Sequence, residues 1–142
     1  MHTSTDLERF VAAQQDKYAT ALAEIKAGRK RSHWMWYIFP QLKGLGLSEM
    51  ARLYGIHDIN EAEAYLAHPV LGKRLLDICH ELSLQPGKDA HAIFGSPDDL
   101  KLRSCLTLFA ALDNTHPVFE TLLKKFYNGS KDVKTLKLLG VS

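Results

Sequence analysis

A basic stretch followed at once by aromatic residues has the residue types in this sequence best suited to binding chemistry. Lys26, Arg29, Lys30 and Arg31 bring four positive charges with no acidic residue among them. A histidine and two tryptophans follow within 33–41. Arginines and backbone N–H groups at a helix start bind phosphate or carboxylate, and indole rings stack on flat or cationic groups. The stretch therefore predicts a site for an anionic compound.

Within this stretch, each residue type predicts a role. Arg29, Lys30 and Arg31 would attract the anion, and Trp36 would contact it. His33 is the first candidate for proton transfer, because histidine exchanges protons readily near neutral pH. A purely structural alternative stays open. In that alternative the cations offset the C-terminal dipole of the preceding helix, and the tryptophans belong to the core.

A second polar group lies within an apolar helical stretch further along the chain. Helical spacing places Lys101 with Ser104 and Arg103 with Thr107 on common faces. These four residues would complete the pocket if the two groups meet across a cleft. Ser104 is also a candidate nucleophile with His33 as its base. Alternatively, the cations are solvated and the two hydroxyl residues pack as small side chains.

Several known site patterns do not occur in the sequence. It has no Gly-x-Ser-x-Gly nucleophile elbow and no complete phosphate-binding loop, since Gly44-Leu-Gly46 lacks the other glycines and the lysine. The seven histidines are scattered without metal-ligand spacing. Asp58 and Glu61 follow His57, but helix capping explains them. We therefore predict no metal site, and the sequence indicates no particular cofactor.

Composition places the chain among ordinary globular proteins. It has 142 residues, a formal net charge of +2, 46% hydrophobic residues and 24% charged residues. This balance gives no general support for nucleic acid or an anionic membrane as partner. Cys79 and Cys105 lie in apolar helical stretches and read as buried free thiols. With no apolar run of membrane-spanning length and no signal-peptide pattern, we expect a cytoplasmic protein.

Helix-start and helix-stop residues occur along the whole chain. Thr5-x-x-Glu8 is a capping box that opens one amphipathic helix running to Gly28. Pro69 and Pro117 fit first helical turns, and Asn128-Gly129 fits a helix stop. Further caps are expected at Ser32, Ser48, Asp58, Asp89, Ser96 and Asp132. We therefore predict an all-α fold: residues 1–142 form a single domain, a compact orthogonal bundle of about seven or eight short helices with no sheet.

Several motifs in a fixed order resemble one known family. They are RSHWMWYIFPQ (31–41), GLG (44–46), YGI (54–56), EAEAYLAHP (61–69), LGKRL (71–75), IFGSPDDLKLRS (93–104) and TLF (107–109). Together they are similar to the DUF1810 family of small, mainly helical proteins, over nearly the whole chain. The resemblance implies a mainly helical fold and brings no established activity with it.

The function expected from the residues is a small-ligand-binding protein, or an enzyme, that acts on an anionic, phosphate-bearing and nucleotide-like compound. Two alternatives from other classes stay open. A nucleic-acid-binding module would use the two basic stretches, of which the second is C-terminal: Lys124, Lys125, Lys131, Lys134 and Lys137. A protein-interaction domain would dock a partner on the aromatic segment and would show an exposed apolar patch.

Overall fold

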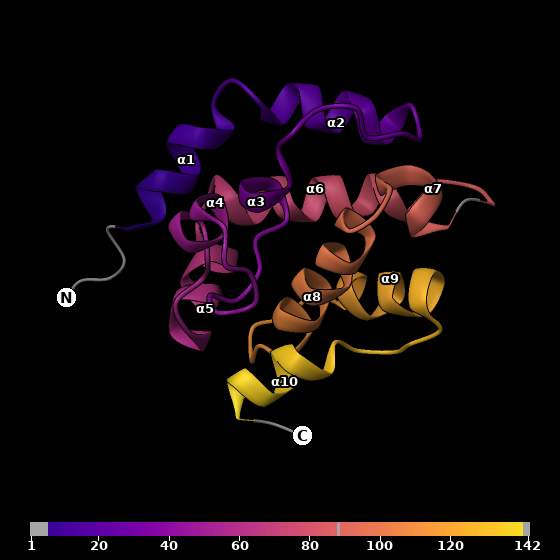
Figure 1. Ribbon diagram of the computed structural model, residues 1–142. Coiled ribbons are helices and arrows are strands. Elements are labelled where there is room, and N and C mark those ends of the chain that lie inside the picture. The colour runs from indigo at the N-terminus through magenta and orange to yellow at the C-terminus, as the bar shows by residue number, and fades with distance from the viewer. Residues whose placement is uncertain (1–5, 88, 141–142) are drawn as a thin grey trace.

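The computed structural model describes residues 6–87 and 89–140, which form ten helices and no sheet (Figure 1). The helices are α1 (Glu8–Gln14), α2 (Tyr18–Lys26), α3 (Met35–Ile38), α4 (Glu49–Leu53), α5 (Ile59–Ala67), α6 (Leu71–Ser83), α7 (Ala90–Phe94), α8 (Asp98–Ala110), α9 (Pro117–Tyr127) and α10 (Val133–Leu139). An isolated parallel bridge joins Leu42 to Ile56. The predicted all-α class is therefore confirmed.

Helix α6 runs through the middle of the molecule (Figure 1). Its apolar residues recur at helical spacing and are buried, among them Leu71, Leu75, Ile78 and Leu82. Helices α2, α5 and α9 pack against it. Burying such a stripe removes leucine and isoleucine side chains from water at about 1.5–3 kcal/mol each, which is what holds α6 in place.

Helix α8, which supplies part of the candidate site, is buried along its second half. It packs against α5, α7, α9 and α10. Six consecutive residues, 104–109, are buried, so the helix has no wide solvated face in its second half. Its first turns remain partly exposed, with Leu100 at the surface and Lys101 and Arg103 half-buried. The polar residues of α8 that can meet a ligand are therefore confined to its N-terminal half.

The predicted count of seven or eight helices is too low, chiefly because the first expected helix is broken. Helix α1 ends at Gln14 and α2 begins at Tyr18, with a turn between them. Gln14 is almost fully buried, and its amide donates hydrogen bonds to the carbonyl of Tyr37 at 2.7 Å and to the hydroxyl of Tyr65 at 2.9 Å. These long-range bonds accompany a break that the local helical pattern does not reveal. The short helices α3, α4 and α7 lie where helix starts were predicted, near Ser32, Ser48 and Asp89.

Most of the predicted helix caps are present. The side chains of Ser48, Asp58, Asp89 and Asp132 accept backbone N–H groups at the starts of α4, α5, α7 and α10. The caps at Ser32 and Ser96 were wrong predictions: Trp34 and Pro97 occupy the N-cap positions of α3 and α8, without a side-chain cap bond. The capping box at Thr5 lies outside the described residues.

Candidate functional site

Three neighbouring cavities form a groove beside the N-terminal half of α8. The first, of about 280 Å³, lies between Lys30, His33 and the start of α8. The second, of about 210 Å³, is lined by Trp36, the 41–48 loop and α4. The third, of about 230 Å³, lies between α8 and the start of α10. Lys101 lines all three cavities, so they are adjoining parts of one groove.

The first cavity contains two lysines that share one carboxylate. The Lys30 ammonium lies 2.8 Å from one oxygen of Asp98, and the Lys101 ammonium lies 3.4 Å from the other. Lys30 also lies over the ring of Trp34, and Lys101 over the ring of Trp36, at 5.0 and 5.2 Å from the ring centroids. Asp98 thus offsets only one of two positive charges, and this cavity keeps a positive excess.

A carboxylate outside the cavities fixes the segment that leads into α3. Glu24 in α2 accepts hydrogen bonds from the backbone N–H groups of Arg31 and Ser32, from the Ser32 hydroxyl and from the Trp34 indole. Partial burial alone would raise the pKa of Glu24, but these hydrogen bonds outweigh it and lower the pKa to about 2. Glu24 therefore remains ionised and holds the Lys30–Trp34 segment against α2.

The third cavity is the most positively charged part of the groove. Lys101, Arg103 and Lys134 line it, against the single acid Asp132. The Arg103 guanidinium lies 3.9 Å from Asp132, at the outer limit of an ion pair. The Nε atom of Arg103 is buried and has no hydrogen-bond partner among the described residues. Three cations against one acid leave the third cavity with a net positive charge.

The structure thus brings together most residues of the two predicted groups. Those that line the groove are Lys30, His33, Trp36, Lys101, Arg103 and Ser104. His33 is exposed and Trp36 is half-buried, so neither is lost in the core. Trp34, in contrast, is fully buried, as the structural alternative expected for the tryptophans, and so is Phe39.

Three predicted residues lie apart from the groove. The side chains of Arg29 and Arg31 are exposed and line none of the three cavities. Thr107 is 1% exposed, and its hydroxyl donates to the Arg103 carbonyl and accepts the Asp132 N–H. Thr107 therefore ties α8 to the start of α10, which is a structural role rather than ligand contact.

The two candidate catalytic residues do not form a nucleophile–base pair. His33 lines the first cavity and Ser104 the third. The Ser104 hydroxyl donates to the carbonyl of Leu100 at 3.3 Å, as serine often does within a helix. Nucleophilic activation needs a base within hydrogen-bond reach of the hydroxyl. Within the described residues, the Ser104 hydroxyl is bonded to a backbone carbonyl and not to a base.

Two groove residues were missed by the sequence analysis. Gln41 lines the second and third cavities, and Lys134 lines the third. Gln41 is a polar residue directly after the aromatic run and Pro40, and this position was the available signal. Lys134 belongs to the C-terminal lysines, which are exposed; its place beside α8 follows from the packing of α10 on α8.

One group of potential metal ligands occurs among residues 6–87 and 89–140. Atoms of Asp6, His57 and Glu61 lie within 4.8 Å of one another. The Glu61 carboxylate is, however, already paired with the Arg9 guanidinium at 3.2 Å and accepts the His57 backbone N–H at 2.9 Å. Its negative charge is thus matched by a cation of the chain, and we assign no metal to it.

The remaining sequence features are placed as follows. Cys79 and Cys105 are free, fully buried thiols, as predicted, and burial raises the pKa of both. Within the described parts of the chain, no helix has the length and apolar character needed to cross a membrane.

Fold and groove together define a small all-helical protein with a basic, partly aromatic groove. The chain belongs to the DUF1810 family, described as a protein of unknown function, whose model matches residues 4–139. It is similar to the crystal structure of the conserved hypothetical protein Rv1873 from Mycobacterium tuberculosis, with 48% identity and a TM-score of 0.93. The match covers 96% of this chain and 98% of that one. None of the curated proteins matches the chain.

Proposed function

We propose that the protein binds an anionic, phosphate-bearing small molecule in the groove, with the charged group in the third cavity. The observation that carries this proposal is the charge of the third cavity, where the three cations Lys101, Arg103 and Lys134 face the single acid Asp132. An arginine fork matches phosphate oxygens in geometry and charge. Lys101 and Lys134 would contact the remaining oxygens.

The shape of the site favours a small molecule over a macromolecule. Adjoining cavities of about 210–280 Å³ are close to the size of ligand pockets, typically about 300–1,000 Å³. A nucleic-acid surface would need many phosphate contacts, whereas the whole chain has a net charge of +2. A protein partner would instead use the exposed Leu47 and Leu100 at the edge of the groove.

A reaction on the bound compound would use His33 for proton transfer, because it is the histidine that lines the groove. Ser104 would contact the ligand and not attack it, since its hydroxyl donates to the Leu100 carbonyl rather than to a base. The groove would therefore bind the compound, and His33 would carry out any proton transfer.

Thermal unfolding in the presence of phosphate compounds tests this proposal. Inorganic phosphate, pyrophosphate and ribose 5-phosphate are added to the wild type, to Arg103→Met and to Arg52→Met, whose parent arginine is exposed in α4. A ligand at 100 times its Kd stabilises by about 2.7 kcal/mol, which raises Tm by a few degrees. We expect such a shift in the wild type and in R52M, and its loss in R103M.

The other outcomes of this experiment distinguish the alternatives. A shift that survives in R103M places the anion elsewhere and overturns the proposed site. A shift given only by a short DNA or RNA at low salt replaces the small ligand by nucleic acid. If no phosphate compound changes Tm at millimolar concentration, the protein is not a phosphate-binding protein.

The proposal also includes the setting of the protein. We propose that residues 1–142 act as one domain, a compact orthogonal bundle, in the cytoplasm. One continuous core cluster of buried residues, from Leu7 to Leu123, supports a single domain. The two buried free thiols are compatible with a reducing compartment.

A further inference from the structure

We infer that the ligand of the groove is a nucleoside monophosphate, whose flat nitrogen heterocycle occupies the second cavity. This inference rests on the proposed function, which places the phosphate in the third cavity. The ring of the nucleotide would contact Trp36 and Gln41, which line the second cavity.

The second and third cavities are joined along one edge. Gln41, Leu45 and Lys101 line both of them. Each cavity alone is smaller than a typical ligand pocket, whereas the two together reach that size. A ligand with a charged end and an uncharged end therefore fits better than a lone phosphate ion.

The second cavity differs in chemistry from the third. Its lining is mainly apolar, and Lys101 is its one charged residue. The apolar residues are Trp36, Leu45, Gly46, Leu47 and Ala51, and the uncharged polar residues are Gln41 and Ser48. Apolar and aromatic walls suit the faces of a flat ring. A sugar or a polyol in this position would turn its hydroxyl groups toward leucine side chains and lose hydrogen bonds to water.

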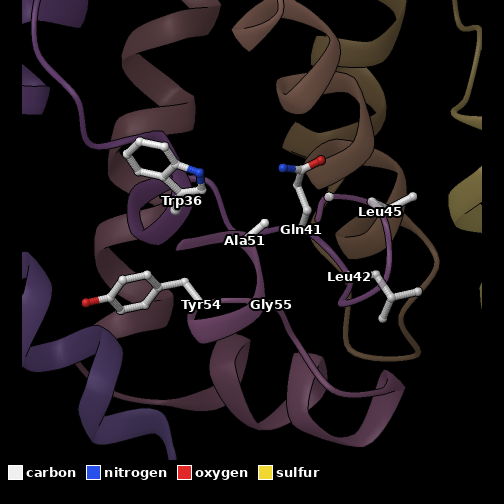
Figure 2. A pocket seen from close by; sticks show the side chains of 8 residues that line it. Trp36, Gln41, Leu42, Leu45, Ala51, Tyr54 and Gly55 are labelled. Atoms are coloured by element: carbon white, nitrogen blue, oxygen red, sulfur yellow. The ribbon is translucent and has the colours of Figure 1, made fainter. Parts of the chain in front are cut away.

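Two polar groups in this cavity are open to water. Within the described parts of the protein, the Trp36 indole N–H and the Gln41 side-chain amide make no hydrogen bond, and neither group is buried. In Figure 2 the indole nitrogen and the Gln41 amide point toward one another. Both also line a narrow crevice of about 10 Å³ beside Tyr54 and Gly55, which has room for about one water molecule.

These two groups match the edge of a nitrogen heterocycle. The indole can only donate, so it requires a ring nitrogen or a carbonyl oxygen. The Gln41 amide has an NH2 group that donates and a carbonyl oxygen that accepts, and rotation about its last bond exchanges their positions. It can therefore pair with an acceptor and a donor atom that are neighbours on the edge of a ring. Purine and pyrimidine bases carry such edges, and a glutamine amide can pair with them at two points.

Lys101 stands where the two ends of this ligand would join. Its ammonium lies 5.2 Å from the Trp36 ring centroid and lines both cavities. It can therefore contact the phosphate from the ring side. The order along the groove is the ring beside Trp36, then Lys101, then the phosphate at Arg103 and Lys134.

Calorimetric titration with matched ligands tests the inference. The affinities of the four common nucleoside 5′-monophosphates are compared with that of ribose 5-phosphate, which has the phosphate and sugar without the base. We expect at least one nucleotide to bind ten times more tightly than ribose 5-phosphate. In Gln41→Leu and in Trp36→Phe, this ratio falls at least fivefold. In Gln15→Leu, the same replacement at an exposed glutamine, it stays as in the wild type.

Each other outcome overturns the inference in a distinguishable way. If ribose 5-phosphate binds through Arg103 and no nucleotide binds more tightly, the proposed function stands and the heterocycle is wrong. If a nucleotide binds tightly but both Q41L and W36F keep the wild-type ratio, the base lies outside the second cavity. If no phosphate compound binds, the proposed function itself fails.

Discussion

A single carboxylate outside the groove determines how one wall of the groove is built. Glu24 receives four hydrogen bonds from the segment that carries Lys30 and leads to His33. Trp34, which is fully buried, is held by one of them at 2.9 Å. Of the three cations at 29–31, Lys30 lines the groove, whereas Arg29 and Arg31 are exposed and line none of its three cavities.

We predict that Glu24→Gln destabilises the protein by about 2 kcal/mol, because hydrogen bonds to a charged acceptor contribute about 1.5–3 kcal/mol. In the variant, an NH2 group would replace one of the two carboxylate oxygens that now accept these hydrogen bonds, so it would face a donor of the 31–34 segment and lose that bond. Urea unfolding at pH 7 measures the loss. Asp16→Asn, at an exposed acid between α1 and α2, is the control and should change stability by less than about 0.5 kcal/mol.

The same residue predicts a pH dependence. Burial raises the pKa of Glu24, but the hydrogen bonds that it accepts have the larger combined effect. The net result lowers the pKa from 4.5 to about 2 in the folded protein. A depressed pKa stabilises the fold above pH 4.5, and this contribution is lost as the pH falls toward 2. Urea unfolding between pH 6 and 2.5 should show a steeper loss in the wild type than in E24Q. Parallel curves would contradict this assignment.

Residue types alone gave a useful but incomplete site. Histidine, tryptophan and arginine in one short segment predicted a binding region, and Lys30, His33 and Trp36 do line the groove. The sequence could not show which of the three adjacent cations, Arg29, Lys30 and Arg31, faces the groove. That depends on the direction in which the backbone turn points each side chain. Gln41 gave almost no signal, because a glutamine after a proline fits any loop.

At the scale of elements, a close approach of backbone to backbone brings the start of α6 against the end of α5. A Cβ atom on Gly72 would lie 2.0 Å from the carbonyl oxygen of Leu66 and 2.8 Å from its carbonyl carbon. These are backbone atoms, so they cannot move aside as the end of a flexible side chain can. The α5–α6 corner therefore requires a residue without a side chain.

We predict that Gly72→Ala destabilises the protein by about 3 kcal/mol, since overpacking against backbone forces the two helices apart. Chemical denaturation measures the change. Lys73→Ala is the neighbouring control: Lys73 is exposed and loses only its i,i+4 pair with Asp77, which contributes about 0.5 kcal/mol. A G72A protein as stable as the wild type would show that this corner is loosely packed.

Helix positions were predictable to the extent that local chemistry sets them. Side chains of Ser48, Asp58, Asp89 and Asp132 cap helices because an oxygen three residues before a free N–H can reach it. Ser32 fails as a cap because its hydroxyl bonds instead to Glu24, eight residues earlier in sequence. Such a competition between local and tertiary partners is not visible in a local pattern.

At the scale of the whole molecule, one continuous core encloses the two cysteines. Cys79 in α6 and Cys105 in α8 are both 0% exposed, and burial raises the pKa of each thiol. The thiolate is the reactive form, so both residues should be inert in the folded state. Their reactivity then reports on opening of the core as a whole.

We predict that a thiol reagent at pH 8 labels both cysteines only at the rate of unfolding. The measurement is labelling followed by mass spectrometry over increasing urea concentration. Both thiols should become reactive in the same transition as the loss of helical circular dichroism. Rapid labelling of either cysteine while the helical signal is native would show that α6 or α8 opens independently.

The central claim, that the groove binds a phosphate compound beside Arg103, is tested most directly by nuclear magnetic resonance. The ¹⁵N-labelled protein is titrated with a nucleoside monophosphate, and three side-chain N–H signals are followed. The Nε–H of Arg103, whose side chain lines the third cavity, and the indole N–H of Trp36, which lines the second, should shift. The indole N–H of Trp34 is bonded to Glu24 and serves as the internal control. Shifts at Arg103 and Trp36 with Trp34 unchanged are the expected result, and an Arg103 signal that stays in place at saturating ligand would contradict the claim.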